Sequence, residues 1–132
     1  MGSTWRTRDM GDAEENQVKF ALTGQVRVVQ CCLDYEGTGD EDYALNCIVD
    51  GKKLGEVMRR SGVSDITSLF DDGSTDLFPC LEDLTRAIRD VASRCVPGDM
   101  FVFQYSGHGM QKMRASGRSD DFDTLLVLRA RD

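Results

Sequence analysis

The sequence predicts an α/β fold with a mostly parallel sheet flanked by helices, and three observations indicate this class. Short β-branched and apolar runs alternate with amphipathic segments of helical period. The first apolar run lacks the polar alternation of a half-exposed strand, which is typical of strands buried on both faces of a parallel sheet. Turns rich in glycine and aspartate separate the segments. We expect right-handed βαβ units, with functional side chains where the strands end at their carboxyl edge.

The fold is expected to begin near Leu22. Residues 1–20 are polar and aperiodic, so we expect them to form a mobile arm and residues 21–132 to form the domain. A chain of 132 residues has about the length of one domain, so a single core is expected. Within it, the run VRVVQCCL at residues 26–33 predicts the first strand.

The first helix is predicted from Glu41 to about Arg60, where apolar residues recur at steps of three and four. Gly51 and Gly55 on one side of this helix would let it lie close to the sheet. A short second strand, DITSLF, is predicted at residues 65–70, and the acidic loop DDGSTD follows it.

The second half of the chain continues with a helix and a strand. A second helix that ends ahead of Pro97 is predicted by the spacing of five apolar residues: Leu81, Leu84, Ile88, Val91 and Ala92. A third strand, MFVFQY, is predicted at residues 100–105. After it we expect a polar loop as far as Asp121 and a last apolar run, TLLVL, at residues 124–128.

Composition limits the functional classes. With 40% hydrophobic and 30% charged residues, the chain has the make-up of a folded globular protein. The apolar runs are too short to cross a membrane, and residues 1–16 lack the apolar core of a signal peptide, so we expect a cytoplasmic protein that binds no membrane. A net charge of −7 argues against a general nucleic-acid binder and permits basic partners. The five cysteines form no zinc-binding pattern and are expected to be reduced.

The most specific stretch is YSGHG, residues 105–109, which holds the single histidine of the chain directly after the third predicted strand. Glycines on both sides of His108 remove two Cβ atoms, so the backbone can turn sharply and another chain can approach the imidazole. This pattern favours an active-site histidine. A histidine whose hydrogen bonds are satisfied within a loop is the alternative.

YSGHG, at the end of an apolar strand that begins after Gly98-Asp99, resembles the histidine motif of the metacaspases, a family of caspase-like cysteine peptidases. Two other segments are similar in order and spacing: the first strand with LDY at residues 33–35, and the helix LNCIVDGKKLGEVMRRSGV at residues 45–63, which contains the Cys-x-x-Asp element. The resemblance covers roughly Val26 to Leu128. It implies a caspase-like fold.

The resemblance also implies a chemistry. His108 would be the general base and acid for a cysteine thiolate, because an imidazole takes up and releases a proton near neutral pH. Gly107 and Gly109 would form its active-site loop. Family members cleave after Arg or Lys, and the matching specificity residues would be Asp50, with Cys47 and Ser106 beside it, since a carboxylate can pair with a guanidinium. Without the family, Asp50 is a solvated carboxylate of a helix.

The nucleophile of the family is missing from these residues. It lies on a strand after the histidine, about 50 residues on in a caspase-type spacing, whereas this chain ends at Asp132 and all its cysteines precede His108. Cys31 and Cys32 lie in the first strand and are interpreted as buried packing residues, as are Cys80 and Cys95. We therefore expect the front part of a catalytic domain, incomplete at its C-terminus and inactive alone, with an unpaired sheet edge open to association.

Metal binding is a weaker expectation. The chemistry needs no cofactor, but some metacaspases carry a regulatory calcium ion near the acidic segment that follows the histidine. Asp120, Asp121 and Asp123 are the matching residues. Calcium takes about six to eight oxygen ligands, so these three carboxylates would need further ligands, and a solvated acidic loop is the alternative.

Two functions follow from the resemblance. The chain is either part of an active, calcium-stimulated endopeptidase directed at Arg or Lys, or a short protein without a nucleophile that binds basic peptides or a full-length relative through its open sheet edge. A nucleotide-binding or signalling domain of flavodoxin-like type matches the alternation of strands and helices alone. That third class leaves the SGHG motif unexplained.

Overall fold

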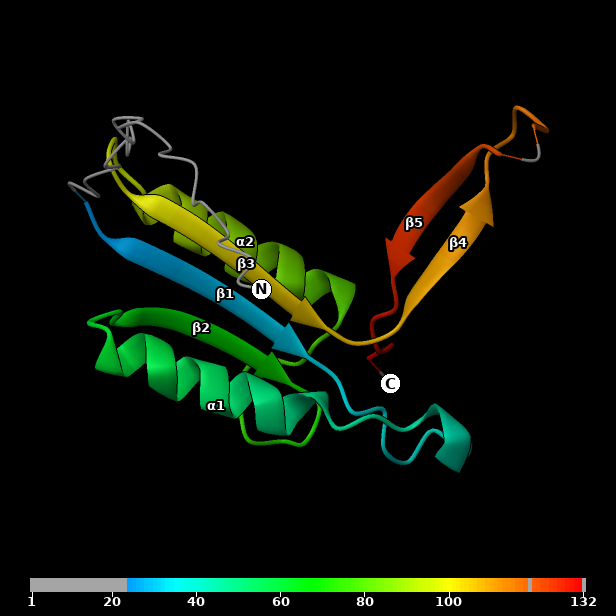
Figure 1. The fold of residues 1–132 in the computed structure, drawn as a ribbon, viewed down its shortest axis with the longest axis horizontal. Helices are drawn as coiled ribbons and strands as arrows, with labels where there is room; N and C mark the ends of the chain where they lie inside the picture. The colour runs from blue at the N-terminus through cyan, green and yellow to red at the C-terminus, as the bar shows by residue number, and fades with distance from the viewer. Residues whose placement is uncertain (1–23, 119, 132) are drawn as a thin grey trace, which may run out of the picture.

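The computed structural model describes residues 24–118 and 120–131. The expected arm, residues 1–20, lies outside these residues. Strands β1 (Val26–Cys32), β2 (Asp65–Phe70) and β3 (Met100–Ser106) form a parallel sheet in the order β2-β1-β3 (Figure 1). The predicted α/β class and its parallel sheet are confirmed. Neither helix among the described residues is long and apolar enough to cross a membrane.

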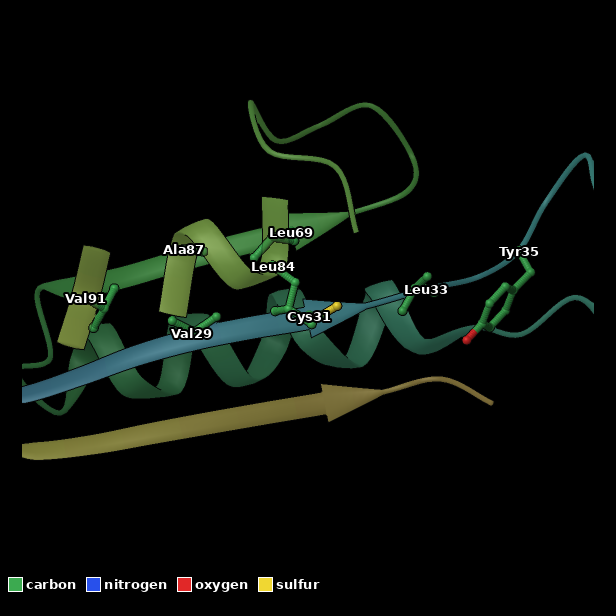
Figure 2. Close-up of a cluster of buried hydrophobic side chains, with 8 residues drawn as sticks. All are labelled: Val29, Cys31, Leu33, Tyr35, Leu69, Leu84, Ala87 and Val91. Atoms are coloured by element: carbon green, nitrogen blue, oxygen red, sulfur yellow. The ribbon is translucent and has the colours of Figure 1, made fainter. Parts of the chain in front are cut away.

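Two helices cover opposite faces of the central strand. On one face, Val29 and Cys31 of β1 pack against the buried stripe of α2 (Leu81–Arg94), in the cluster drawn in Figure 2. On the other face, Cys32 packs with residues of β2 and of α1 (Cys47–Arg60). Burial on both faces explains why β1 from Val28 to Cys32 is apolar apart from Gln30, while Arg27 lies in the less buried start of the strand.

Gln30 is a buried polar residue that links the sheet to α1. Its Nε2 donates to the carbonyl oxygen of Gly51 at 2.7 Å, and its Oε1 accepts from the hydroxyl of Ser68 at 3.1 Å. The bond to Gly51 is possible because α1 lies very close to β1, as the sequence predicted from its two glycines. A Cβ atom on Gly51 would lie 2.5 Å from the sulfur of Cys32, so only glycine fits there.

The predicted start of the first helix is wrong. Residues Glu41–Tyr43 form a separate 3-10 turn, and α1 begins only at Cys47. The chain between them is tied to the end of β1, because the amide of Leu45 donates to the carbonyl oxygen of Asp34 at 2.8 Å. This contact interrupts a pattern that is helical in the sequence.

The region after β3 also differs from the prediction. The expected polar loop contains a strand, β4 (Gly109–Met113), which pairs antiparallel with β5 (Phe122–Leu126) in a hairpin that stands away from the main sheet (Figure 1). All residues of β4 are exposed, so their sequence carries no burial pattern that would mark a strand. A smaller correction concerns α2, whose buried apolar residues start at Leu84, while Leu81 is 72% exposed.

Arg27 ties together the starts of all three parallel strands. Its guanidinium contacts Asp65 at the start of β2 at 2.7 Å and Asp99 just before β3 at 2.9 Å. The bond from Arg27, with those from two backbone amides, lowers the pKa of Asp99. The bond from Arg94 lowers the pKa of Asp65, burial opposes this effect, and the bond from Arg27 adds to it.

These two carboxylates predict a loss of stability in acid. Their pKa values are lower in the folded chain than in the unfolded chain, where an aspartate titrates at about 3.9. Their stabilisation is therefore complete above about pH 4 and is lost as the pH falls through the lower folded-state values. Arg27→Gln is expected to lower the free energy of unfolding at neutral pH and to weaken its acid dependence. Urea denaturation from acid to neutral pH measures both, and an unchanged acid dependence would refute this assignment.

Candidate active site

His108 follows β3 directly, and two tyrosine hydroxyls hold its backbone. Its amide donates to the hydroxyl oxygen of Tyr35 at 2.9 Å, and its carbonyl oxygen accepts from the hydroxyl of Tyr105 at 2.7 Å. The hydroxyl of Tyr35 donates in turn to the carbonyl oxygen of Val127 at 2.7 Å. Burial raises the pKa of Tyr35 and of Tyr105, which keeps both hydroxyls protonated and able to donate.

The imidazole is fixed by a residue that the sequence did not single out for the site. Nε2 of His108 lies 2.7 Å from the carbonyl oxygen of Tyr43, and the two rings are stacked with their centroids 4.0 Å apart. The ring of Tyr35 lies on the imidazole as well, at 4.8 Å. Because a carbonyl oxygen only accepts, the hydrogen-bond network assigns the proton of the neutral ring to Nε2 and leaves Nδ1 with a free lone pair.

The glycines on either side of His108 have different roles. A Cβ atom on Gly107 would lie 2.6 Å from the hydroxyl oxygen of Tyr35 and 2.7 Å from that of Tyr105, so a side chain has no room there. A Cβ on Gly109 would meet nothing closer than the carbonyl oxygen of Leu125 at 3.7 Å. Gly107 therefore lets the tyrosine pair reach the backbone of His108, and Gly109 is not required by contact.

The three expected specificity residues lie near the carboxyl ends of β1 and β3. Ser106 is the register partner of Cys32, and Cys47 at the start of α1 packs against the cluster that contains Cys32. Asp50, one helical turn after Cys47, is exposed and makes no ion pair with any other described residue. Its carboxylate is therefore available to a cation from solution.

The cysteines of β1 are packing residues, as interpreted from the sequence. Cys31 and Cys32 are fully buried, and burial raises the pKa of Cys31 to about 12 and that of Cys32 to about 11. Such thiols stay protonated near neutral pH and are poor nucleophiles. Cys80, which precedes α2, is buried as well.

The structure does not gather the three acidic residues expected near calcium. Asp121 and Asp123 each pair with Arg114, at 3.3 and 2.7 Å, and Asp120 lies 3.5 Å from Arg118. No group of three or more metal-binding side chains occurs among the residues that the structure describes. Because the carboxylates face arginines, these residues alone do not fit a calcium ion, and a regulatory calcium stays an implication of the family.

Comparison with known proteins identifies the family. A family model described as "Metacaspase, peptidase C14 domain" matches residues 27–129, which hold both α-helices and, apart from Val26 of β1, all five strands of the described residues. The chain belongs to the metacaspases. It is 30% identical to Metacaspase-2 of Arabidopsis thaliana over 79% of this chain and 26% of that protein. It is 32% identical to Metacaspase-3 of Trypanosoma brucei brucei over 84% of this chain and 32% of that protein.

This membership confirms the resemblance seen in the sequence. The metacaspase chain spans about a quarter to a third of the length of these curated relatives. This short span is consistent with the expectation that the chain holds only part of a caspase-like catalytic domain. The family is one of cysteine-type peptidases. Within the chain, the match covers His108 with its tyrosine pair and the helix that carries Cys47 and Asp50.

Proposed function

We propose that this chain supplies the general base and acid of a metacaspase-type endopeptidase, with His108 in that role. The observation that supports this most directly is the bond between Nε2 of His108 and the carbonyl oxygen of Tyr43, at 2.7 Å. It orients the ring and leaves Nδ1 as the atom that can accept a proton.

The proposed reaction is acyl transfer to a cysteine that lies beyond Asp132 in the full protein. Nδ1 of His108 takes the thiol proton, and the thiolate sulfur bonds to the carbonyl carbon of the scissile peptide. The carbon–nitrogen bond then breaks, and the imidazolium returns its proton to the leaving amine. Water, deprotonated by the same nitrogen, hydrolyses the thioester and releases the second product. No cofactor takes part in these steps.

The proposed substrates carry Arg or Lys at the cleaved bond. Asp50 is the residue proposed to pair with this side chain, because its exposed carboxylate has no other partner among the described residues. Cys47 and Ser106 would line the same side of the sheet. The net charge of −7 also favours basic peptides over acidic ones.

Peptide hydrolysis tests this function. The natural protein would be captured from its source with an antibody against the α2 helix, weighed by mass spectrometry, and compared with the 132-residue chain on fluorogenic peptides ending in Arg or Asp. We expect a natural mass above 14.7 kDa and turnover of the Arg peptide alone, while the 132-residue chain shows none. Turnover of the Arg peptide by the purified 132-residue chain, abolished in His108→Ala, would contradict the expectation that this chain alone is inactive. A natural protein above 14.7 kDa that does not cleave the Arg peptide would contradict the proposal.

A second function is favoured by the outer edge of β3. This strand pairs only with β1 in the described sheet, and its side chains include exposed Met100, Phe101 and Phe103. Such an edge can accept an added strand from a peptide or a full-length relative. If the natural protein has a mass of 14.7 kDa, a binding protein of this kind is the better description.

A further inference from the structure

We propose that Asp71 is a positioning residue for His108, because its buried carboxylate holds the turn after β1, through which two of the partners of the histidine are anchored. These partners are the hydroxyl of Tyr35 and the carbonyl oxygen of Tyr43. The proposal rests on the proposed function only in taking His108 as the catalytic base. Asp71 lies in the acidic loop after β2, which the sequence marked as acidic without assigning it a role.

The carboxylate of Asp71 is buried, and both of its oxygens accept hydrogen bonds. It follows the last residue of β2, and its side chain is only 1% exposed. One oxygen accepts the amide of Asp34 at 2.8 Å, and the other accepts the amide of Tyr35 at 2.9 Å. A buried carboxylate is stable only where donors replace water, and two consecutive amides fix both the position and the orientation of the turn after β1.

The first branch of this network leads through Tyr35 to the backbone of His108. Tyr35 has a φ of 58°, in the left-handed region that a bulky residue rarely adopts. Such a conformation is disfavoured by roughly 1–2 kcal/mol and persists where its surroundings hold it. The bond from the Tyr35 amide to Asp71 supplies such a hold. In this conformation the hydroxyl of Tyr35 reaches the amide of His108.

The second branch leads through Asp34 to the imidazole. The carbonyl oxygen of Asp34 accepts the amide of Leu45, and its carboxylate accepts the amide of Ile48 in the first turn of α1 at 2.9 Å. Tyr43 therefore lies on a segment that is anchored to Asp34 just after it. Because Asp71 fixes the amide of Asp34, it also limits where the carbonyl oxygen of Tyr43 can meet Nε2 of His108.

A third element meets the same carboxylate. The guanidinium of Arg129 lies 3.3 Å from the oxygen of Asp71 that binds Tyr35, and it donates to the carbonyl oxygen of Glu36 at 2.9 Å. Arg129 lies two residues after Val127, whose carbonyl oxygen accepts a hydrogen bond from the hydroxyl of Tyr35. The turn after β1, the loop after β2 and the segment after β5 thus converge on Asp71. A local displacement of this carboxylate would disturb the Tyr35 hydroxyl and the Tyr43 carbonyl oxygen that bind His108.

The single histidine makes the test direct. In the 132-residue chain labelled with 15N, the imidazole resonances belong to His108 alone and report which ring nitrogen carries the proton. Hydrogen exchange of the His108 amide reports its bond to Tyr35. We expect the Nε2–H form in the unmodified chain. Asp71→Asn places an amide group where two backbone donors need acceptors, so it should mix the tautomers and speed exchange of the His108 amide by about tenfold.

Asp72→Asn is the matched control. Asp72 is the adjacent carboxylate, but it is partly exposed and pairs with Lys52 instead of with the turn. Its variant should leave both readouts of His108 unchanged. Asp71→Glu, which keeps the charge but displaces the oxygens, should change them in the same direction as Asp71→Asn.

Each other outcome rejects the proposal. A folded Asp71 variant with the original tautomer and exchange rate would show that Asp71 does not position His108. Unfolding of both Asp71 variants, seen by circular dichroism, would show instead that Asp71 supports the whole domain. Neither readout involves catalysis. A failure of the proposed peptidase function would therefore leave these spectra unaffected, and the two failures can be told apart.

Discussion

Gly107→Ala is expected to lower the free energy of unfolding by about 2–4 kcal/mol, since it combines overpacking with broken hydrogen bonds. The added methyl group would lie 2.6 Å from the hydroxyl oxygen of Tyr35 and 2.7 Å from that of Tyr105. Neither tyrosine can move away freely. The first is bonded to the amide of His108 and the second to its carbonyl oxygen. Relief of the clash therefore releases the backbone that carries the imidazole.

Gly109→Ala is the control for this effect. It adds the same methyl group two residues away, where the nearest atom is the carbonyl oxygen of Leu125 at 3.7 Å. We expect a change within about 0.5 kcal/mol. Urea denaturation of the two variants beside the unmodified chain measures the difference. Equal losses from the two substitutions would refute the close approach of the tyrosine pair to Gly107.

The sequence predicted the elements whose residues carry a local pattern. The mostly apolar run of β1 follows from burial on two faces, and the three- and four-residue spacing of α2 follows from burial on one face. The structure has both elements. The start of α1 was wrong because the backbone of Leu45 bonds to that of Asp34, a contact that the spacing of apolar residues does not reveal. The strand β4 was missed because it exists only through its pairing with β5.

The residues of the candidate site also differ in whether a local sequence pattern marks them. His108 could be found because two glycines and a preceding strand mark it in a single short stretch. Tyr43 contributes a backbone carbonyl, which every residue has, so no residue type could reveal it. Asp71 and Asp72 are adjacent and chemically identical in the sequence, yet only the first is buried against the turn after β1. Their difference arises from the placement of β1 beside β2, a property of the sheet.

Gly51→Ala and Gly55→Ala are expected to change stability in opposite directions, although both replace a glycine in the middle of α1. Alanine gains about 1 kcal/mol of helix propensity at either position. At Gly51 the new methyl group would lie 2.5 Å from the sulfur of Cys32 and 3.3 Å from its Cβ, both fully buried. Overpacking of this kind is unfavourable by about 1–3 kcal/mol. A net loss of up to about 2 kcal/mol is therefore expected.

At Gly55 the nearest atoms are a guanidinium nitrogen of Arg59 at 3.4 Å and the side-chain oxygen of Gln30 at 3.6 Å. The guanidinium is the end of a flexible side chain on an exposed residue, so it can move aside without loss. The helix propensity then dominates, and Gly55→Ala should raise the free energy of unfolding by up to about 1 kcal/mol. Urea denaturation of the two variants and of the unmodified chain measures the change in the free energy of unfolding. If both substitutions stabilise the chain, α1 does not lie against Cys32 at the distance described.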